Sequence, residues 1–161
     1  MRLYIREKIF SFGDNFSITD ENGNEAFRVL GQVFSFGNKL RLYDNRDTEL
    51  IYIEQKLFRF LPEYTIYAGN SELATVKKNL SFFSHNFSID SIYGSYEIQG
   101  DFTAHSFSLY KSGESFAASM EKKWFSFGDS YVIEIADSEN IPFTLALVIV
   151  IDQAIHDNQN N

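Results

Sequence analysis

Apolar and polar residues alternate with a period of two along most of this chain. The alternating apolar positions include Leu40 and Leu42, Ile51 and Ile53, Tyr96 and Ile98, and Tyr131, Ile133 and Ile135. Such alternation is typical of strands that bury one face. Segments rich in Gly, Asn and Asp separate the runs and favour chain reversals. The spacing predicts about a dozen short antiparallel strands in a sandwich or barrel.

The segment from Asn140 to His156 does not alternate, because its middle is apolar on every side. Asn140 suits a helix N-cap, and Pro142 falls in the first turn, where a missing N–H is harmless. The residues from Gln153 to His156 form a polar finish. These signals favour a helix over about 141–156, although the β-branched run Val148–Ile151 fits a buried strand equally well by periodicity. In either form the segment must be surrounded by protein.

The second half of the chain resembles the first. The tetrapeptide that begins at Asn15 returns at Asn86, and Leu42-Tyr43 returns as Leu109-Tyr110, at offsets of 71 and 67 residues. A four-residue deletion reconciles the two offsets. We therefore expect two similar multi-stranded units whose closure on each other removes both sheet edges.

A chain of 161 residues with 44% hydrophobic and 22% charged residues is suited to one folded core. We expect a single domain over residues 1–156 and a disordered polar tail over 157–161.

Cysteine is absent, which excludes disulfides and thiolate chemistry and suits a reducing compartment. The N-terminus lacks the apolar region of a signal peptide, and the run Leu145–Ile151 is too short to span a membrane. The sequence predicts a cytoplasmic protein without a transmembrane segment.

The net charge of −8 repels phosphates, so we expect no binding to nucleic acid. Two adjacent lysine pairs stand out against this acidic background: Lys77-Lys78 and Lys122-Lys123. Each pair lies near a predicted strand end. Solvated loop lysines are the commoner explanation, but these four residues are the candidates for binding lipid headgroups or other anions.

Other motifs have structural explanations. Phe-Ser-Phe-Gly occurs at 10–13, 34–37 and 125–128, where alternation places two rings on one face and Gly permits the next turn.

The histidines His85, His105 and His156 lack the spacing of a metal site, so we expect no metal and no cofactor. Asp152 and His156, one turn apart, fit an exposed pair at the helix end. No nucleophile elbow or phosphate-binding loop is present, and no catalytic residue is predicted.

The hairpins of the form Phe-x-Ile-x-Asp, the strand Asp129–Ile135 and the apolar segment that ends at Asp152 together resemble the LURP-one-related family over nearly the whole chain. The resemblance implies a tubby C-terminal-like fold, which is a closed antiparallel barrel of twelve strands around a hydrophobic central helix. Phospholipid scramblases share this fold, and tubby proteins bind phosphoinositides. The basic residues of tubby proteins that contact the lipid have no equivalents that align here, and a fold alone does not transfer function.

Three functions stay open at this level. The first is a non-enzymatic binding module that contacts anionic lipid or a protein partner through rim loops and the lysine pairs. The second is a structural or self-assembling protein. The third is a hydrolase-like enzyme that uses surface carboxylates, for which no pair stands out.

Overall fold

The computed structural model describes residues 1–5, 15–32, 38–57, 59–79, 86–101, 105–112, 114–125 and 128–156. Within these ranges the chain forms twelve strands and one helix. They are β1 (Arg2–Ile5), β2 (Phe16–Thr19), β3 (Glu25–Gln32), β4 (Lys39–Asp44), β5 (Glu49–Gln55), β6 (Glu63–Ala68), β7 (Ser71–Asn79), β8 (Asn86–Ser91), β9 (Tyr96–Asp101), β10 (Ser106–Lys111), β11 (Ser115–Phe125), β12 (Gly128–Ile135) and α1 (Ile141–His156). The tail predicted for 157–161, His85 and most of the Phe-Ser-Phe-Gly motifs lie outside the described residues.

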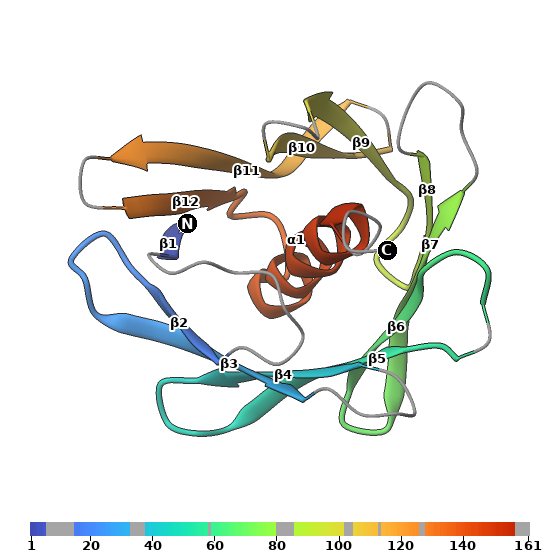
Figure 1. The fold of residues 1–161 in the computed structure, drawn as a ribbon, viewed down its shortest axis with the longest axis horizontal. Coiled ribbons are helices and arrows are strands. Elements are labelled where there is room, and N and C mark those ends of the chain that lie inside the picture. Colours follow the sequence, from blue (N-terminus) through green and yellow to red (C-terminus); the bar gives the residue numbers. More distant parts are fainter. Residues whose placement is uncertain are drawn as a thin grey trace.

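All twelve strands belong to one antiparallel sheet in the order β8-β7-β6-β5-β4-β3-β2-β1-β12-β11-β10-β9. β1 pairs with both β2 and β12, so the first and last strands of the chain meet inside the sheet. Figure 1 shows the sheet curled around α1, with the N-terminus beside β12. The structure confirms the predicted barrel of about twelve strands around a C-terminal helix.

The ring of hydrogen-bonded strands is incomplete at one place among the described residues. β8 and β9 stand at the two ends of the strand order, and no ladder joins them in the described ranges. In Figure 1, β9 leans toward β10 and away from β8. The expectation that closure removes both sheet edges is therefore wrong at this place, because among the described residues β8 pairs with β7 alone and β9 with β10 alone.

The C-terminal segment is a helix, as its capping signals predict. The Asn140 side-chain oxygen accepts a hydrogen bond from the backbone N–H of Phe143 at 3.1 Å, and the Asn140 carbonyl accepts one from Thr144 N–H at 2.9 Å. Burial inside the barrel outweighs the weak helix propensity of the β-branched residues in Val148–Ile151.

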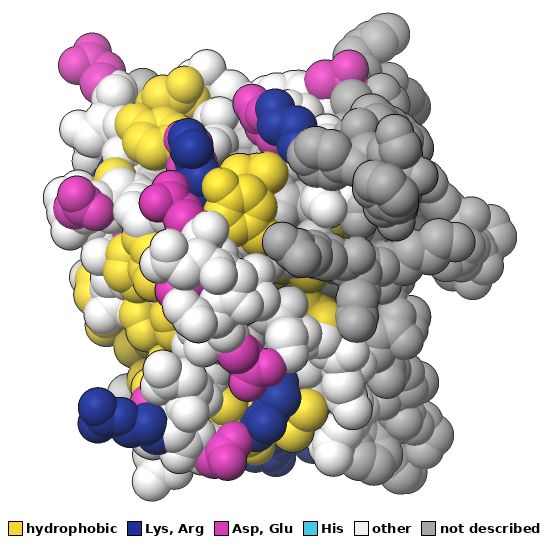
Figure 2. Space-filling model, turned by 90° about the vertical axis from the view of Figure 1, so that its left-hand side faces the viewer, with side chains coloured by type: hydrophobic (Ala, Val, Ile, Leu, Met, Phe, Trp, Pro, Cys, Tyr) yellow, Lys and Arg dark blue, Asp and Glu magenta, His cyan; other side chains and the backbone are white. Residues whose placement is uncertain are grey.

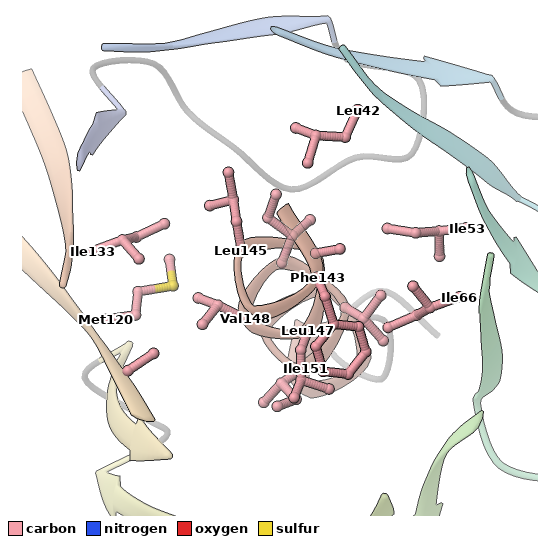
Figure 3. Packing of buried hydrophobic residues seen from close by; sticks show 14 of the residues in the cluster. Leu42, Ile53, Ile66, Met120, Ile133, Phe143, Leu145, Leu147, Val148 and Ile151 are labelled. Carbon is pink, nitrogen blue, oxygen red and sulfur yellow. The ribbon is translucent and has the colours of Figure 1, made fainter. Parts of the chain in front are cut away.

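The core lies between α1 and the inward faces of the strands. α1 packs against β5, β6 and β7 on one side and against β11 and β12 on the other. Figure 3 shows Ile53 and Ile66 on one side of the helix, and Met120 and Ile133 on the other. All four are at most 2% exposed. Burying each such side chain stabilises the fold by about 1.5–3 kcal/mol.

One hairpin in each half of the sheet has the same pairing at matching positions. Leu42 faces Ile51 across β4 and β5, and Leu109, which lies 67 residues later, faces Ala118 across β10 and β11. A β-bulge follows both Leu42 and Leu109. These matches support the predicted repeat, which stays a prediction until the two halves are superposed.

Candidate functional site

The two lysines of the first predicted pair point to opposite faces of β7. Lys77 is exposed, whereas Lys78 is only 8% exposed. The cause is the alternation of side chains along a strand, which places neighbours on opposite faces of the sheet. Lys77 and Lys78 therefore cannot form one anion-binding patch.

The buried member of this pair binds the end of the helix. The Lys78 ammonium group donates a hydrogen bond to the carbonyl oxygen of Ala154 at 3.0 Å. Carbonyl groups in the last turn of a helix lack partners within the helix, and the helix dipole favours a cation there. Lys78 thus ties β7 to the C-terminal turn of α1.

The second pair divides in the same way. Lys122 is half-buried, with its ammonium group 5.9 Å from the centre of the Tyr131 ring, whereas Lys123 is exposed and forms an ion pair with Glu121. Lys123 lines an outer groove of about 400 Å³ that also contains the Arg2–Glu134 ion pair. The charges of these two pairs cancel, so the groove offers no surplus positive charge to an anion.

Mixed charge is also visible over a wider area. Figure 2 shows the face that lies on the left of Figure 1, where cationic and acidic side chains adjoin one another between apolar ones. Surface ion pairs of this kind contribute little to stability.

The acid near the end of the helix is buried, and His105 lies beside it. Asp152 is 0% exposed, and its Oδ1 lies 3.6 Å from Nδ1 of His105, which begins the approach to β10. The exposure expected for Asp152 is therefore wrong, because this side chain is enclosed by the barrel. The predicted pairing of Asp152 with His156 lies outside the described residues, because the His156 side chain is not among them.

A second buried polar cluster lies at the other end of the helix. The Tyr96 hydroxyl donates a hydrogen bond to Glu139 Oε2 at 2.7 Å, and Lys111 Nζ lies 3.4 Å from Glu139 Oε1. Burial raises the pKa of Tyr96, and the hydrogen bond to Glu139 acts in the same direction. Tyr96 therefore stays protonated as a hydrogen-bond donor beside the start of α1.

The connection between β5 and β6 presents apolar side chains to solvent. Phe60 is 90% exposed and Leu57 is 40% exposed, and the exposed cations Lys56 and Arg59 accompany them. The loop is closed at its base, where the backbone N–H of Lys56 donates to the Glu63 carbonyl at 2.8 Å. We call Lys56, Leu57, Arg59 and Phe60 the rim loop.

Lys77 lies next to the rim loop. It faces Glu63 across β6 and β7, and Glu63 also forms an ion pair with Arg59 at 3.2 Å. One acid thus accompanies three exposed cations, Lys56, Arg59 and Lys77. Among the predicted lysines, Lys77 is linked to the rim loop through Glu63, its partner across β6 and β7, which pairs with Arg59.

No motif in the sequence singles out the rim loop. The signal is present at 56–62, where two cations interrupt a run of apolar residues that ends in Pro between two predicted strands. Apolar residues in strands and in loops look alike in a local pattern, so the exposure of Phe60 becomes visible only in the structure.

The described residues offer no site for a metal ion. No three side chains of His, Asp or Glu gather closely enough within the described ranges. In the same part of the chain, no helix has the length and apolar character needed to cross a membrane.

Known proteins resemble this chain along nearly its whole length. The sequence matches the LURP-one-related family over residues 1–152. It is 36% identical over 160 residues to the uncharacterised protein YxjI of Bacillus subtilis strain 168. The aligned region spans 99% of this chain and 97% of YxjI. An X-ray structure of a protein from Arabidopsis thaliana aligns with a TM-score of 0.69 at 21% identity, over 99% of this chain and 91% of that one, and so shows the tubby-like fold. The chain therefore belongs to the LURP-one-related family.

Proposed function

We propose that this protein is a non-enzymatic module that binds the surface of membranes containing anionic lipid. The rim loop, together with Lys77, is the contact region. The observation that carries the proposal is the 90% exposure of Phe60 between cationic neighbours.

An exposed aromatic ring beside cations suits the interface of a membrane. The ring enters the boundary between headgroups and acyl chains, while the cations stay at the level of the phosphates. Each Lys or Arg near an anionic surface contributes about 1 kcal/mol, and burying a Phe side chain contributes about 1.5–3 kcal/mol. Three cations and one ring therefore support weak, reversible binding.

The charge of the whole protein sets the orientation. The chain carries a net charge of −8, so most of its surface is repelled by anionic lipid. The rim loop and Lys77 carry more positive than negative charge, with Glu63 as the acid in the group. We infer that the protein approaches the membrane with this end of the barrel first.

Co-sedimentation with vesicles tests the proposal. We expect binding to vesicles of phosphatidylcholine mixed with phosphatidylglycerol, and much weaker binding to phosphatidylcholine alone. Binding should be stronger at about 0.01 M salt than at about 0.15 M, since the Debye length falls from about 30 Å to about 8 Å.

Variants of the rim loop make the test specific. Phe60→Ser should weaken binding about tenfold or more, because it removes the apolar insertion. Arg59→Gln or Lys77→Gln should each weaken it by about fivefold, since each removes one cation at the surface. Arg46→Gln, which removes an exposed cation from the turn between β4 and β5 at the opposite end of the barrel, is the matched control and should leave binding unchanged.

Two results would overturn the proposal. One is the absence of co-sedimentation with anionic vesicles at low salt. The other is equal loss of binding in Arg46→Gln and Arg59→Gln, because it would show attraction without a defined contact region.

A further inference from the structure

We propose that the seam between β8 and β9 receives an extended peptide segment of a partner protein as an added strand. The segment would carry apolar side chains at alternate positions and basic side chains between them. This inference does not rest on lipid binding, although Lys77 of the proposed lipid-contact region lies on β7 beside β8.

The direction of the backbone groups along β8 follows from its pairing with β7. The N–H of Ile92 donates to the carbonyl of Leu73 at 2.9 Å, which makes these residues a hydrogen-bonded pair. In an antiparallel ladder such pairs alternate with non-bonded pairs, so Asp90 and Ser88 also bond to β7. The backbone groups of Phe87 and Ile89 consequently point away from β7 and into the seam.

The pairing of β9 with β10 sets the direction of its backbone groups in the same way. The N–H of Ser112 donates to the carbonyl of Ser95 at 3.0 Å, so alternate residues from Ser95 onward bond to β10. The backbone groups of Ile98 and Gly100 therefore point into the seam from the opposite side. Two rows of hydrogen-bonding groups face each other without a ladder between them in the described ranges.

In the first half of the barrel, the strands that correspond to β8 and β9 are β2 and β3, and these two are paired. At the repeat offset of 71 residues, Phe16 and Ile18 of β2 correspond to Phe87 and Ile89 of β8. There, Phe16 pairs with Val29 and Ile18 pairs with Phe27. The open seam is thus the place where the second half departs from the pairing of the first.

The apolar side chains at the seam are incompletely covered. Phe16 and Ile18 in the paired half are 4% and 0% exposed. Their counterparts Phe87 and Ile89 are half-buried, as is Ile98 on the other side. An added strand with inward apolar side chains would complete this part of the core, in the manner of β-strand addition to a sheet edge.

The outward side chains along the seam indicate the charge of the partner. Asp90 on β8 and Glu97 and Asp101 on β9 are exposed acids. Lys77 on β7, which faces Ser88, is an exposed cation on the other side of β8. Acidic groups therefore predominate, and a strand with outward basic residues complements them. A second copy of this chain would bring the same acids to the seam and is disfavoured.

The test uses a synthetic peptide of alternating valine and arginine with blocked ends. Amide exchange by NMR is measured for the free protein and after addition of the peptide. In the free protein, Phe87, Ile89 and Ile98 should exchange about tenfold or more faster than Ser88 and Asp90, which bond to β7. The peptide should slow the amide exchange of Phe87 and Ile89 and leave the exchange rates of Ser88 and Asp90 unchanged.

A control peptide separates strand addition from charge attraction. It has the same sequence with methylated backbone nitrogens at every valine, which removes the donors that would bond to Phe87 and Ile89 while it keeps the charge. Strand addition predicts at least about a tenfold loss of affinity for this peptide. The double variant Asp90→Lys with Glu97→Lys should also weaken binding of the unmethylated peptide, whereas Glu114→Lys, in the turn between β10 and β11, should have a smaller effect.

Three outcomes would overturn the inference. If Phe87, Ile89 and Ile98 are as protected in the free protein as Ser88 and Asp90, the seam is already closed. If both peptides bind equally, the attraction is electrostatic and involves no added strand. If the unmethylated peptide does not bind, the seam does not accept a strand of this chemistry.

Discussion

The ammonium group of Lys78 on β7 lies 3.0 Å from the carbonyl oxygen of Ala154 in the last turn of α1. The two residues are 76 positions apart in the sequence. This contact fixes the helix end against the barrel wall, and it explains why a lysine occurs at a position that faces the core. It also leads to the first prediction.

Lys78→Met should lower the free energy of unfolding by about 1.5–3 kcal/mol, because methionine keeps the apolar stem but loses a charged hydrogen bond. Lys77→Met should change it by less than about 0.5 kcal/mol, since Lys77 is exposed. Urea denaturation measures both. Equal effects of the two substitutions would show that the contact with Ala154 does not stabilise the helix end.

His105 and Asp152 should be energetically coupled, because their side chains lie 3.6 Å apart and Asp152 is fully buried. A double-mutant cycle with His105→Asn and Asp152→Asn should give a coupling energy of about 0.5–3 kcal/mol. The cycle of Asp152→Asn with Tyr96→Phe, at the other end of α1, should be additive within about 0.5 kcal/mol. Additivity in the first cycle would contradict the pairing.

Tyr96 should make the free energy of unfolding fall with rising pH in the alkaline range. Burial raises its pKa in the folded state, so above about pH 10 the unfolded chain loses the phenol proton while the folded protein keeps it. The stabilisation is fully present below the unfolded pKa and is lost as the pH rises above it. Wild type should lose up to about 1.4 kcal/mol per pH unit more than Tyr96→Phe between about pH 10 and pH 12.

Denaturant titrations at several pH values measure this difference. Tyr96→Phe should also be less stable at neutral pH by about 1–3 kcal/mol, since Glu139 loses a buried hydrogen-bond donor. Parallel pH curves for the two proteins would be incompatible with the raised pKa.

Gly100 should tolerate no side chain. A Cβ at this position would lie 2.4 Å from the carbonyl oxygen of Ser106 and 2.5 Å from Cα of Phe107, both of which are backbone atoms of β10. Gly100→Ala should therefore destabilise the protein by about 2–4 kcal/mol. Gly69→Ala, where φ is +56° and a Cβ would meet nothing within 4 Å, should cost only about 1 kcal/mol. Thermal unfolding of both variants tests the order.

The proposed surfaces differ in how visible they are in the sequence. The lysine pairs are conspicuous as adjacent charges, but alternation along a strand separates Lys77 from Lys78. The rim loop contains apolar residues that look like part of a strand in the sequence. Only the path of the chain between β5 and β6 reveals that Phe60 is exposed. The seam has no local signal, because β8 and β9 alternate like every other strand.

The sequence by itself determined the strands and their amphipathic faces, and its capping signals favoured a helix over a buried strand for the C-terminal segment. Side chains alternate along a strand whatever surrounds it, and the cap at Asn140 acts within one helical turn, so both can be predicted from neighbouring residues. Tertiary structure alone decided that Asp152 lies beside His105, that Lys78 reaches Ala154, and that no ladder joins β8 to β9 among the described residues. Such contacts join residues that are distant along the chain, and they depend on how the whole sheet curves around α1, which no local pattern encodes.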